Sequence, residues 1–213
     1  MIKIMKYLNF FFFLFFSFSV NAKTLKLPEV VSEYVCNTQF IIGAASLKTR
    51  TFQSKNKKRI DTVLSNVPQS VIIDYEKQKV TWIWPKTNSY LSLPLIKKNQ
   101  EDLKKATNII KLDKLNSDYL RGFEVDLYKL KLSLPDGTTE ESTRWITKHG
   151  ITLKEVGFIE GKEGKIHFYS EFSNVKVFKQ DERIFEIPEG YIIAPVDYLD
   201  DVNELLKTMV KRS

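Results

Sequence analysis

Residues 71–90 read VIIDYEKQKVTWIWPKTNSY, and this stretch decides the fold class. After the polar turn EKQ, Val80, Trp82 and Trp84 occupy alternate positions. Because successive side chains of a strand point to opposite faces, this alternation predicts a β-strand with one apolar face. Pro85 cannot donate a backbone hydrogen bond and ends the strand. The stretch therefore predicts an antiparallel hairpin followed by a second turn at PKTN.

The same period-two alternation recurs over residues 34–178, for example at Phe168 and Phe172. Turn signals separate the apolar runs at a spacing of roughly 8–15 residues, which favours hairpins over helical crossovers. Within residues 123–134 the apolar phase shifts, which predicts a bulge or a strand that is apolar on both faces. We expect a mainly β (α+β) fold with about nine or ten strands in an antiparallel meander.

Three segments outside this pattern predict helices. Apolar residues over 199–210 follow helical spacing, with Asp197 as a cap and basic residues in the last turn. Residues 99–108 predict a short polar helix, and residues 25–35, with Pro28 near the start, predict a third. We expect these two or three helices to cover one face of the sheet.

Residues 1–22 have the features of an export signal. Two lysines precede a Phe-rich apolar run over residues 8–20, and the small-residue motif VNA follows. The run is shorter than the roughly 20 residues that a membrane-spanning helix needs. We expect cleavage after Ala22, a periplasmic location, and a single domain over residues 23–213.

The residue types that carry chemistry are scarce. The chain has 213 residues, a net charge of +7 and 43% hydrophobic residues, which excludes a disordered or disulfide-stapled class. Its single cysteine, Cys36, and two histidines, His149 and His167, are too few for a thiolate-rich or histidine-based metal site. A Cys36–His nucleophilic pair stays open because such partners meet in space. We predict a non-enzymatic protein without a metal or cofactor.

Basic residues gather on one predicted hairpin, and they are Lys55, Lys57, Lys58 and Arg59. In an exported protein, such a patch favours an anionic membrane surface or an envelope protein over nucleic acid as the partner. A solvated face is the commonest alternative. The patch defines an alternative function, an envelope interaction module that docks a partner through its basic face.

Three stretches carry a family resemblance, and they are RID at 59–61 with 71–90, LRGFE at 120–124 with RWIT at 144–147, and FEIPEGY at 185–191. In this order they resemble exported bacterial domains of the LolA/LolB-like outer-membrane lipoprotein carrier superfamily, in a branch that ends in Phe-x-x-Pro-x-Gly-Tyr. The resemblance spans most of residues 35–193.

This resemblance implies an unclosed antiparallel β-barrel, or half-barrel, whose concave face is lined by apolar side chains and lidded by helices. It implies a cavity for a lipid, a lipoprotein acyl chain or another hydrophobic ligand, and we expect a monomer. An ordinary dry core is the alternative for any one lining residue. The candidate lining residues are Trp82, Trp84, Tyr90, Trp145, Phe168 and Phe172.

Overall fold

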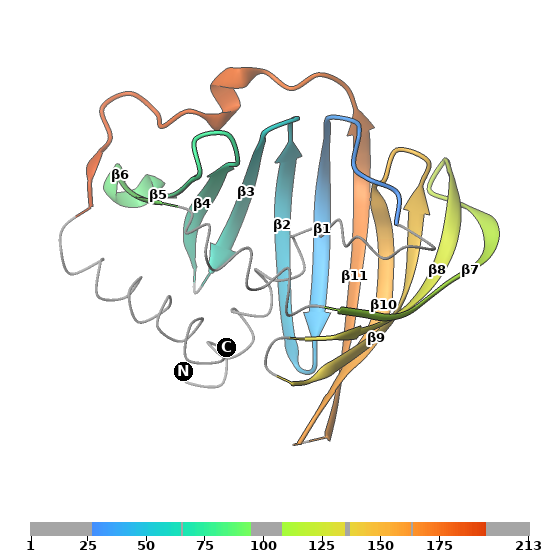
Figure 1. Ribbon diagram of the computed structural model, residues 1–213. Helices are drawn as coiled ribbons and strands as arrows, with labels where there is room; N and C mark the ends of the chain where they lie inside the picture. The colour runs from blue at the N-terminus through green and yellow to red at the C-terminus, as the bar shows by residue number, and fades with distance from the viewer. Residues whose placement is uncertain (1–26, 65, 95–107, 135–136, 163, 195–213) are drawn as a thin grey trace.

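The computed structural model describes residues 27–64, 66–94, 108–134, 137–162 and 164–194. These residues form one sheet of twelve strands and two short 3-10 helices (Figure 1). The strands are β1 (Tyr34–Ile42), β2 (Ala45–Gln53), β3 (Lys57–Leu64), β4 (Val67–Asp74), β5 (Lys79–Trp84), β6 (Ser89–Pro94), β7 (Asn108–Leu120), β8 (Phe123–Ser133), β9 (Thr139–Thr147), β10 (Thr152–Gly161), β11 (Gly164–Val177) and β12 (Ile192–Ile193). The helices are η1 (Pro85–Thr87) and η2 (Glu182–Phe185).

Two antiparallel meanders build the sheet. One comprises β1 to β6 and the other β7 to β11, and the pairing of β1 with β11 joins them. The strand order is β12-β6-β5-β4-β3-β2-β1-β11-β10-β9-β8-β7, so in the described part of the chain the edge strands β12 and β7 do not meet. The predicted unclosed antiparallel sheet is confirmed. The predicted nine or ten strands are too few, and β12 adds one parallel pair with β6.

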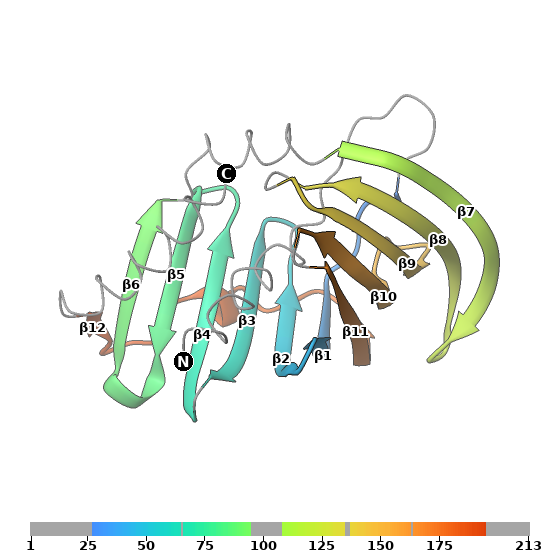
Figure 2. The same cartoon turned by 90° about the horizontal axis from the view of Figure 1, so that it is seen from below.

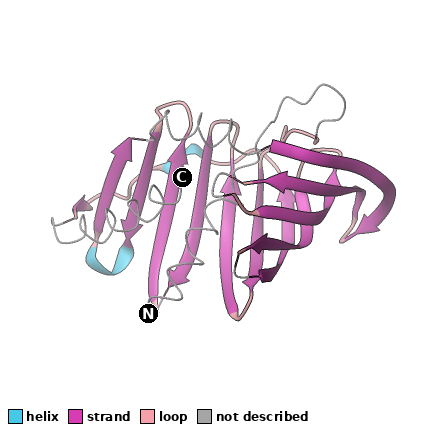
Figure 3. Ribbon diagram, turned by 60° about the horizontal axis from the view of Figure 1, so that its bottom comes forward, coloured by secondary structure: helices cyan, strands magenta, loops and turns pink. Residues whose placement is uncertain are grey.

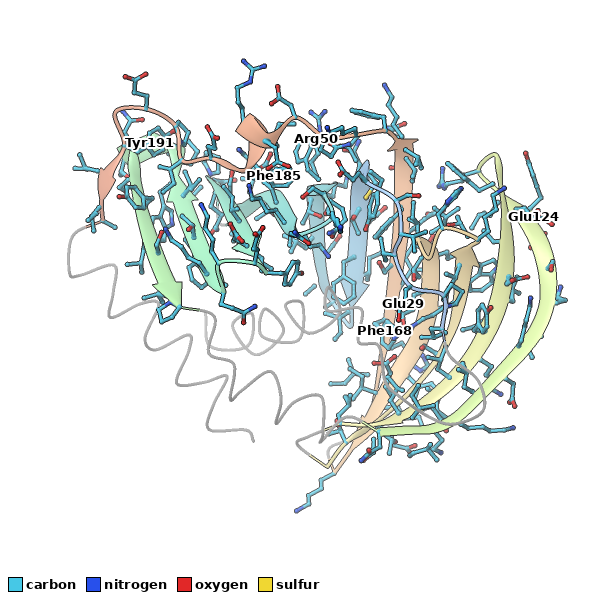
Figure 4. All side chains as sticks on the ribbon, turned by 45° about the horizontal axis from the view of Figure 1, so that its top comes forward. Glu29, Arg50, Glu124, Phe168, Phe185 and Tyr191 are labelled. Atoms are coloured by element: carbon cyan, nitrogen blue, oxygen red, sulfur yellow. The ribbon has the colours of Figure 1, made fainter. Side chains whose placement is uncertain are left out.

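The sheet curves strongly at the end formed by β7 to β11, which gives it a concave and a convex side (Figure 2). Phe168 lies on the concave side, whereas Phe185 comes from the segment that crosses the convex side (Figure 4). We call these the inner face and the outer face. Since side chains alternate along a strand, the registers assign every neighbour of Phe168 to one of the two faces.

The described residues contain no α-helix (Figure 3), and none of their helices is long and apolar enough to cross a membrane. The predicted helix over 25–35 is wrong in its described part, because residues 27–33 are not helical and β1 begins at Tyr34. Pairing of β1 on both sides outweighs the local helix signal. The predicted helix over 199–210 and most of that over 99–108 lie outside the described residues, and Asn108 begins β7.

The phase shift predicted for residues 123–134 reflects a strand, β8, that is apolar on both faces. Val125 and Leu127 pack in one buried cluster, and Tyr128 and Leu130 pack in another. The register of β8 with β9 runs without a shift. The register of β8 with β7 does shift opposite Asp126 and Tyr128, so β8 is apolar on both faces and also lies beside a bulge of β7.

The segment after β11 covers part of the outer face. Asp181 caps η2 by accepting a hydrogen bond from the backbone N–H of Arg183. Phe185 is buried against Ile72 and Ile83 of β4 and β5. Gly190 has a φ of +81° in the turn that leads into β12. We call this segment, residues 178–191, the strap. It packs against the outer face of the sheet.

Gly157 fixes the close approach of β9, β10 and the ring of Phe168. A Cβ atom at this position would lie 2.3 Å from the backbone oxygen of Glu141 and 2.8 Å from the Phe168 ring. We expect Gly157→Ala to lower the free energy of unfolding by about 3 kcal/mol, because backbone and ring must both move. Urea unfolding measures this loss.

Gly161→Ala is the matched control, because the atom nearest to its added Cβ is a side-chain methyl carbon of Thr138 at 3.1 Å and not a backbone atom. A loss as large in the control as in Gly157→Ala would show that the close approach is not the cause.

Candidate functional site

Four of the six predicted lining residues share the inner face. Trp82 and Trp84 lie at alternate positions of β5, and Phe168 and Phe172 do so in β11. The registers carry one face from Phe168 through β1, β2, β3 and β4 to Trp82. Aromatic side chains from the two meanders therefore lie on the same, concave side of the sheet, separated by β4, β3, β2 and β1.

These aromatic residues belong to three apolar clusters, and Phe172 packs in the cluster of Tyr34 and Cys36, against which Trp145 also packs. Trp82 is buried with Val71 and Leu91, and Trp84 packs against the same cluster. Phe168 is buried with residues of β1, and partly buried apolar side chains of β2, β10 and β11 surround it. The inner face is therefore apolar on both sides of its centre.

Tyr90 and Trp145 do not line the inner face with the other four residues. Tyr90 pairs with Ile83 and packs in the outer cluster around Phe185. Trp145 pairs with Lys154, whose Nζ lies 4.8 Å from the centre of its ring. The hairpin pairing of Trp82 with Leu91 already implies the outer position of Tyr90, because Tyr90 precedes Leu91 by one residue.

The predicted basic patch does not form one surface. Lys55 is exposed in the turn before β3, but Lys57, Lys58 and Arg59 lie within β3, so their side chains alternate between the two faces. Lys58 is only 5% exposed and belongs to the inner face with Ile73, its partner in β4. A run of adjacent charges in the sequence is therefore a poor guide to a charged surface once it forms a strand.

The other two basic side chains have acidic or carbonyl partners near the outer strap. Lys57 Nζ lies 2.7 Å from Glu182 Oε2. Arg59 Nε lies 2.7 Å from Asp61 Oδ1, and its Nη1 donates to the backbone oxygen of Ile184 at 2.8 Å. These cations hold the strap against β3 instead of presenting a free positive patch.

The centre of the inner face is polar, which the sequence analysis missed. Cys36 pairs with Thr51, and Thr38 pairs with Thr49, so β1 and β2 bring four small polar side chains together. Lys58 follows on β3, opposite Gln53. The signal in the sequence is weak, because these residues are spread over three strands and each is an ordinary strand residue.

Burial shifts the pKa values of two side chains at the centre of the inner face. Burial lowers the pKa of Lys58 to about 8, and burial raises the pKa of the Cys36 thiol to about 12. Cys36 is therefore a neutral thiol near pH 7 and a poor nucleophile. His149 Nδ1 lies 3.1 Å from Ser32 Oγ, and the His167 ring packs against Phe158.

A buried ion triad occupies the inner face of β9 and β10. Arg144 Nη2 lies 3.1 Å from Glu140 Oε1, and Arg144 Nε lies 2.5 Å from Glu155 Oε1. Ser142 Oγ donates to Glu140 at 3.0 Å. Burial, with Glu155 nearby, raises the pKa of Glu140 to about 7, although Arg144 opposes the shift.

The inner face combines apolar area with a few buried charges, which suits a ligand with an apolar body and a polar end. Within the described ranges, no three or more His, Cys, Asp or Glu side chains come together in a way that could hold a metal ion.

No protein-family model matches the chain, and no curated protein matches it in sequence. Among solved structures, an uncharacterized conserved protein from Thermus thermophilus matches with a TM-score of 0.52 and 12% identity, over 76% of this chain and 90% of that chain. The MucA/MucB complex of Pseudomonas aeruginosa matches with a TM-score of 0.50 and 9% identity, over 75% and 56%. Lipoprotein LppX of Mycobacterium tuberculosis has a TM-score of 0.39 and 10% identity, over 66% and 86%. The matches to the Thermus and Pseudomonas proteins show a likeness of fold.

The raised pKa of Glu140 predicts how stability depends on pH. A carboxyl whose pKa is higher in the folded than in the unfolded chain stabilises the fold below the unfolded value and loses that contribution as pH rises through the folded value. For Glu140 this interval runs from 4.5 to about 7. We expect the unfolding free energy to decline between about pH 5 and pH 8, and the decline to be about 2 kcal/mol smaller in Glu140→Gln.

Glu141→Gln is the control for this measurement by urea unfolding. Glu141 is the next residue of β9, and its hydrogen bond with Lys131 lowers the pKa of its carboxyl, so its contribution changes below that interval. A Glu140→Gln profile parallel to that of the native chain would contradict the prediction.

Proposed function

We propose that this protein binds a hydrophobic ligand, a lipid or the acyl chain of a lipoprotein, on its inner face and acts as a periplasmic carrier. The observation that carries the proposal is the inner face itself. Apolar clusters around Trp82 and Phe168 flank it on the concave side of an unclosed sheet. The export signal expected over residues 1–22 and the motif resemblance point in the same direction.

Apolar burial supplies the binding energy in this proposal. Each methylene group removed from water contributes about 0.8 kcal/mol, so an acyl chain gains affinity from contact area without a precise polar match. Aromatic side chains such as Trp82 and Phe168 contribute large apolar areas to a contact. A carrier needs such a non-directional surface, because its ligand must enter and leave.

The alternative function, docking of a partner through a basic face, loses the feature that motivated it. Lys58 belongs to the inner face, and Lys57 and Arg59 are engaged with the strap. A non-enzymatic function also fits the buried, protonated state of Cys36, whose raised pKa disfavours the thiolate.

Lipid extraction from the protein purified from the bacterial envelope, followed by mass spectrometry, tests the proposal directly. We expect a bound lipid or acylated species in a reproducible ratio to the protein. Repeated recovery of empty protein that also fails to bind an apolar dye would contradict the carrier function.

The three tryptophans offer a test of which face the ligand touches, since bromine atoms on an acyl chain quench tryptophan fluorescence only at short range. We expect dibromostearate to quench Trp145→Phe strongly, because Trp82 and Trp84 remain on the inner face. The double variant Trp82→Phe/Trp84→Phe keeps only Trp145, which lies outside the cluster of Trp82 and Trp84, so it serves as the matched control and should lose most of the quenching. Equal quenching of both variants would place the ligand elsewhere.

A further inference from the structure

An apolar group lies at the end of the sheet where β11 ends and β1 begins (Figure 1). Val177 is the last residue of β11 and pairs with Tyr34. Phe178, the first residue of the strap, follows it, and its backbone N–H donates to the backbone oxygen of Glu33 at 3.2 Å. Val31 precedes Glu33 by two residues, so their Cα atoms lie within about 7 Å of each other. The three apolar side chains therefore come from two segments that lie side by side.

These three side chains are strongly exposed. The exposed fractions are 74% for Val31, 41% for Val177 and 50% for Phe178. A single exposed apolar residue is normal on a protein surface, whereas neighbouring ones are typical of a contact with a protein or a membrane. We call Val31, Val177 and Phe178 the apolar tip.

Exposed lysines surround the apolar tip. Lys176 and Lys179 flank the apolar pair of the sequence KVFK, and Lys55 lies in the exposed turn between β2 and β3. This turn is at the same end of the sheet, because β1 begins opposite the ends of both β2 and β11. Lys55 is also the residue of the predicted basic patch that stays exposed. Among the described residues, none of these three lysines has an ion-pair partner.

Acidic side chains near these lysines are engaged elsewhere. The Glu33 carboxylate accepts a hydrogen bond from a backbone N–H, and the carboxylates of Asp181 and Glu182 pair with basic side chains. Glu29 is exposed, and its backbone lies against the turn at Gly150. The exposed and unpaired charges around the apolar tip are therefore mainly positive.

This combination suits the surface of an anionic membrane. Apolar side chains can enter the boundary between lipid head groups and acyl chains, and lysines beside them gain from anionic head groups. A stable protein–protein contact needs roughly 800 Å² on each partner, which is more than three side chains supply. A second copy of this chain would bring like charges together.

We propose that the apolar tip and Lys55, Lys176 and Lys179 form a docking surface for a membrane that contains anionic lipids. The apolar side chains enter the head-group region, and the lysine ammonium groups lie at lipid phosphates. This inference goes beyond the proposed function, because the contact needs no ligand on the inner face.

Co-sedimentation with two kinds of vesicle tests the charge. One kind is phosphatidylcholine alone, and the other is equal parts of phosphatidylcholine and phosphatidylglycerol. We expect the native chain to bind the anionic vesicles at least about tenfold more tightly, and added salt to weaken this binding. The triple variant Lys55→Gln/Lys176→Gln/Lys179→Gln should lose most of the difference between the two vesicles.

A second triple variant is the control for net charge. It replaces by glutamine three exposed lysines that form no ion pair with a described residue and lie away from the apolar tip, and they are Lys48, Lys129 and Lys162. This variant should keep most of the preference for anionic vesicles. An equal loss in both triple variants would show that net charge alone is responsible and would overturn the docking surface.

Val31→Asp tests the apolar contact, and Val63→Asp is its matched control. Val63 is 59% exposed and lies at the opposite end of the sheet, next to the turn between β3 and β4. We expect Val31→Asp to weaken binding to anionic vesicles several-fold, because a carboxylate does not enter the head-group boundary, and Val63→Asp to weaken it much less. Both variants should melt at the temperature of the native chain, because both valines are exposed.

The outcomes separate this inference from the proposed function. Absence of vesicle binding by the native chain, or equal binding to both vesicles, would overturn the docking surface. Capture of an envelope protein by the native chain but not by Val31→Asp, without vesicle binding, would assign the surface to a protein partner and also overturn it. Binding of an apolar dye reports on the inner face, and the lysine and Val31 variants should retain it. If the native chain docks on vesicles but binds neither dye nor lipid on its inner face, the carrier function fails and the docking surface stands.

Discussion

The structure depends on the pairing of β1 with β11. This pair joins two meanders that are each built from local hairpins, and it connects residues more than a hundred positions apart in the sequence. β1 also pairs with β2, so its register is fixed from both sides. A slip of one residue would move Phe40 and Ile42 to the outer face and Gln39 and Ile41 to the inner one. The assignment of the two faces, and with it the site, follows from this register.

Much of the fold could be predicted because it consists of hairpins between strands that are adjacent in the sequence. The alternation around Trp82 and the turn at Pro85 depend on neighbours within a few residues, and both are confirmed. The predicted number of strands was too low because the strands at the two edges of the sheet were missed. β7 is mostly exposed, so it has no alternating apolar signal, and β12 has only two residues. The helix predicted before Cys36 failed because pairing with β2 and β11 is a tertiary effect that a local pattern cannot report.

The site shows the same division between local and long-range information. Alternation within one strand placed Trp82 with Trp84 and Phe168 with Phe172 correctly. It could not place Trp145, because its face depends on the register of β9 against β10. The prediction that Lys58 belongs to an exposed basic patch was wrong for the opposite reason. Its neighbours in the sequence are basic and face outward, so the run of charges concealed the alternation that buries Lys58. The threonines at the centre of the inner face gave no sequence signal, since β-branched residues are common in strands.

The inner face carries more buried charge than a packing core needs. A buried ion pair or triad generally contributes less to stability than apolar side chains of the same size, because both charges must leave water. The triad around Arg144 and the ammonium of Lys58 both have this cost, and they lie on the same face of one sheet. The outer face differs: its strap packs Phe185 on Ile72 and Ile83, and the ion pair of Lys57 with Glu182 is partly solvated. The contrast between the two faces is that the outer face buries apolar side chains under the strap, whereas the inner face also buries charged side chains.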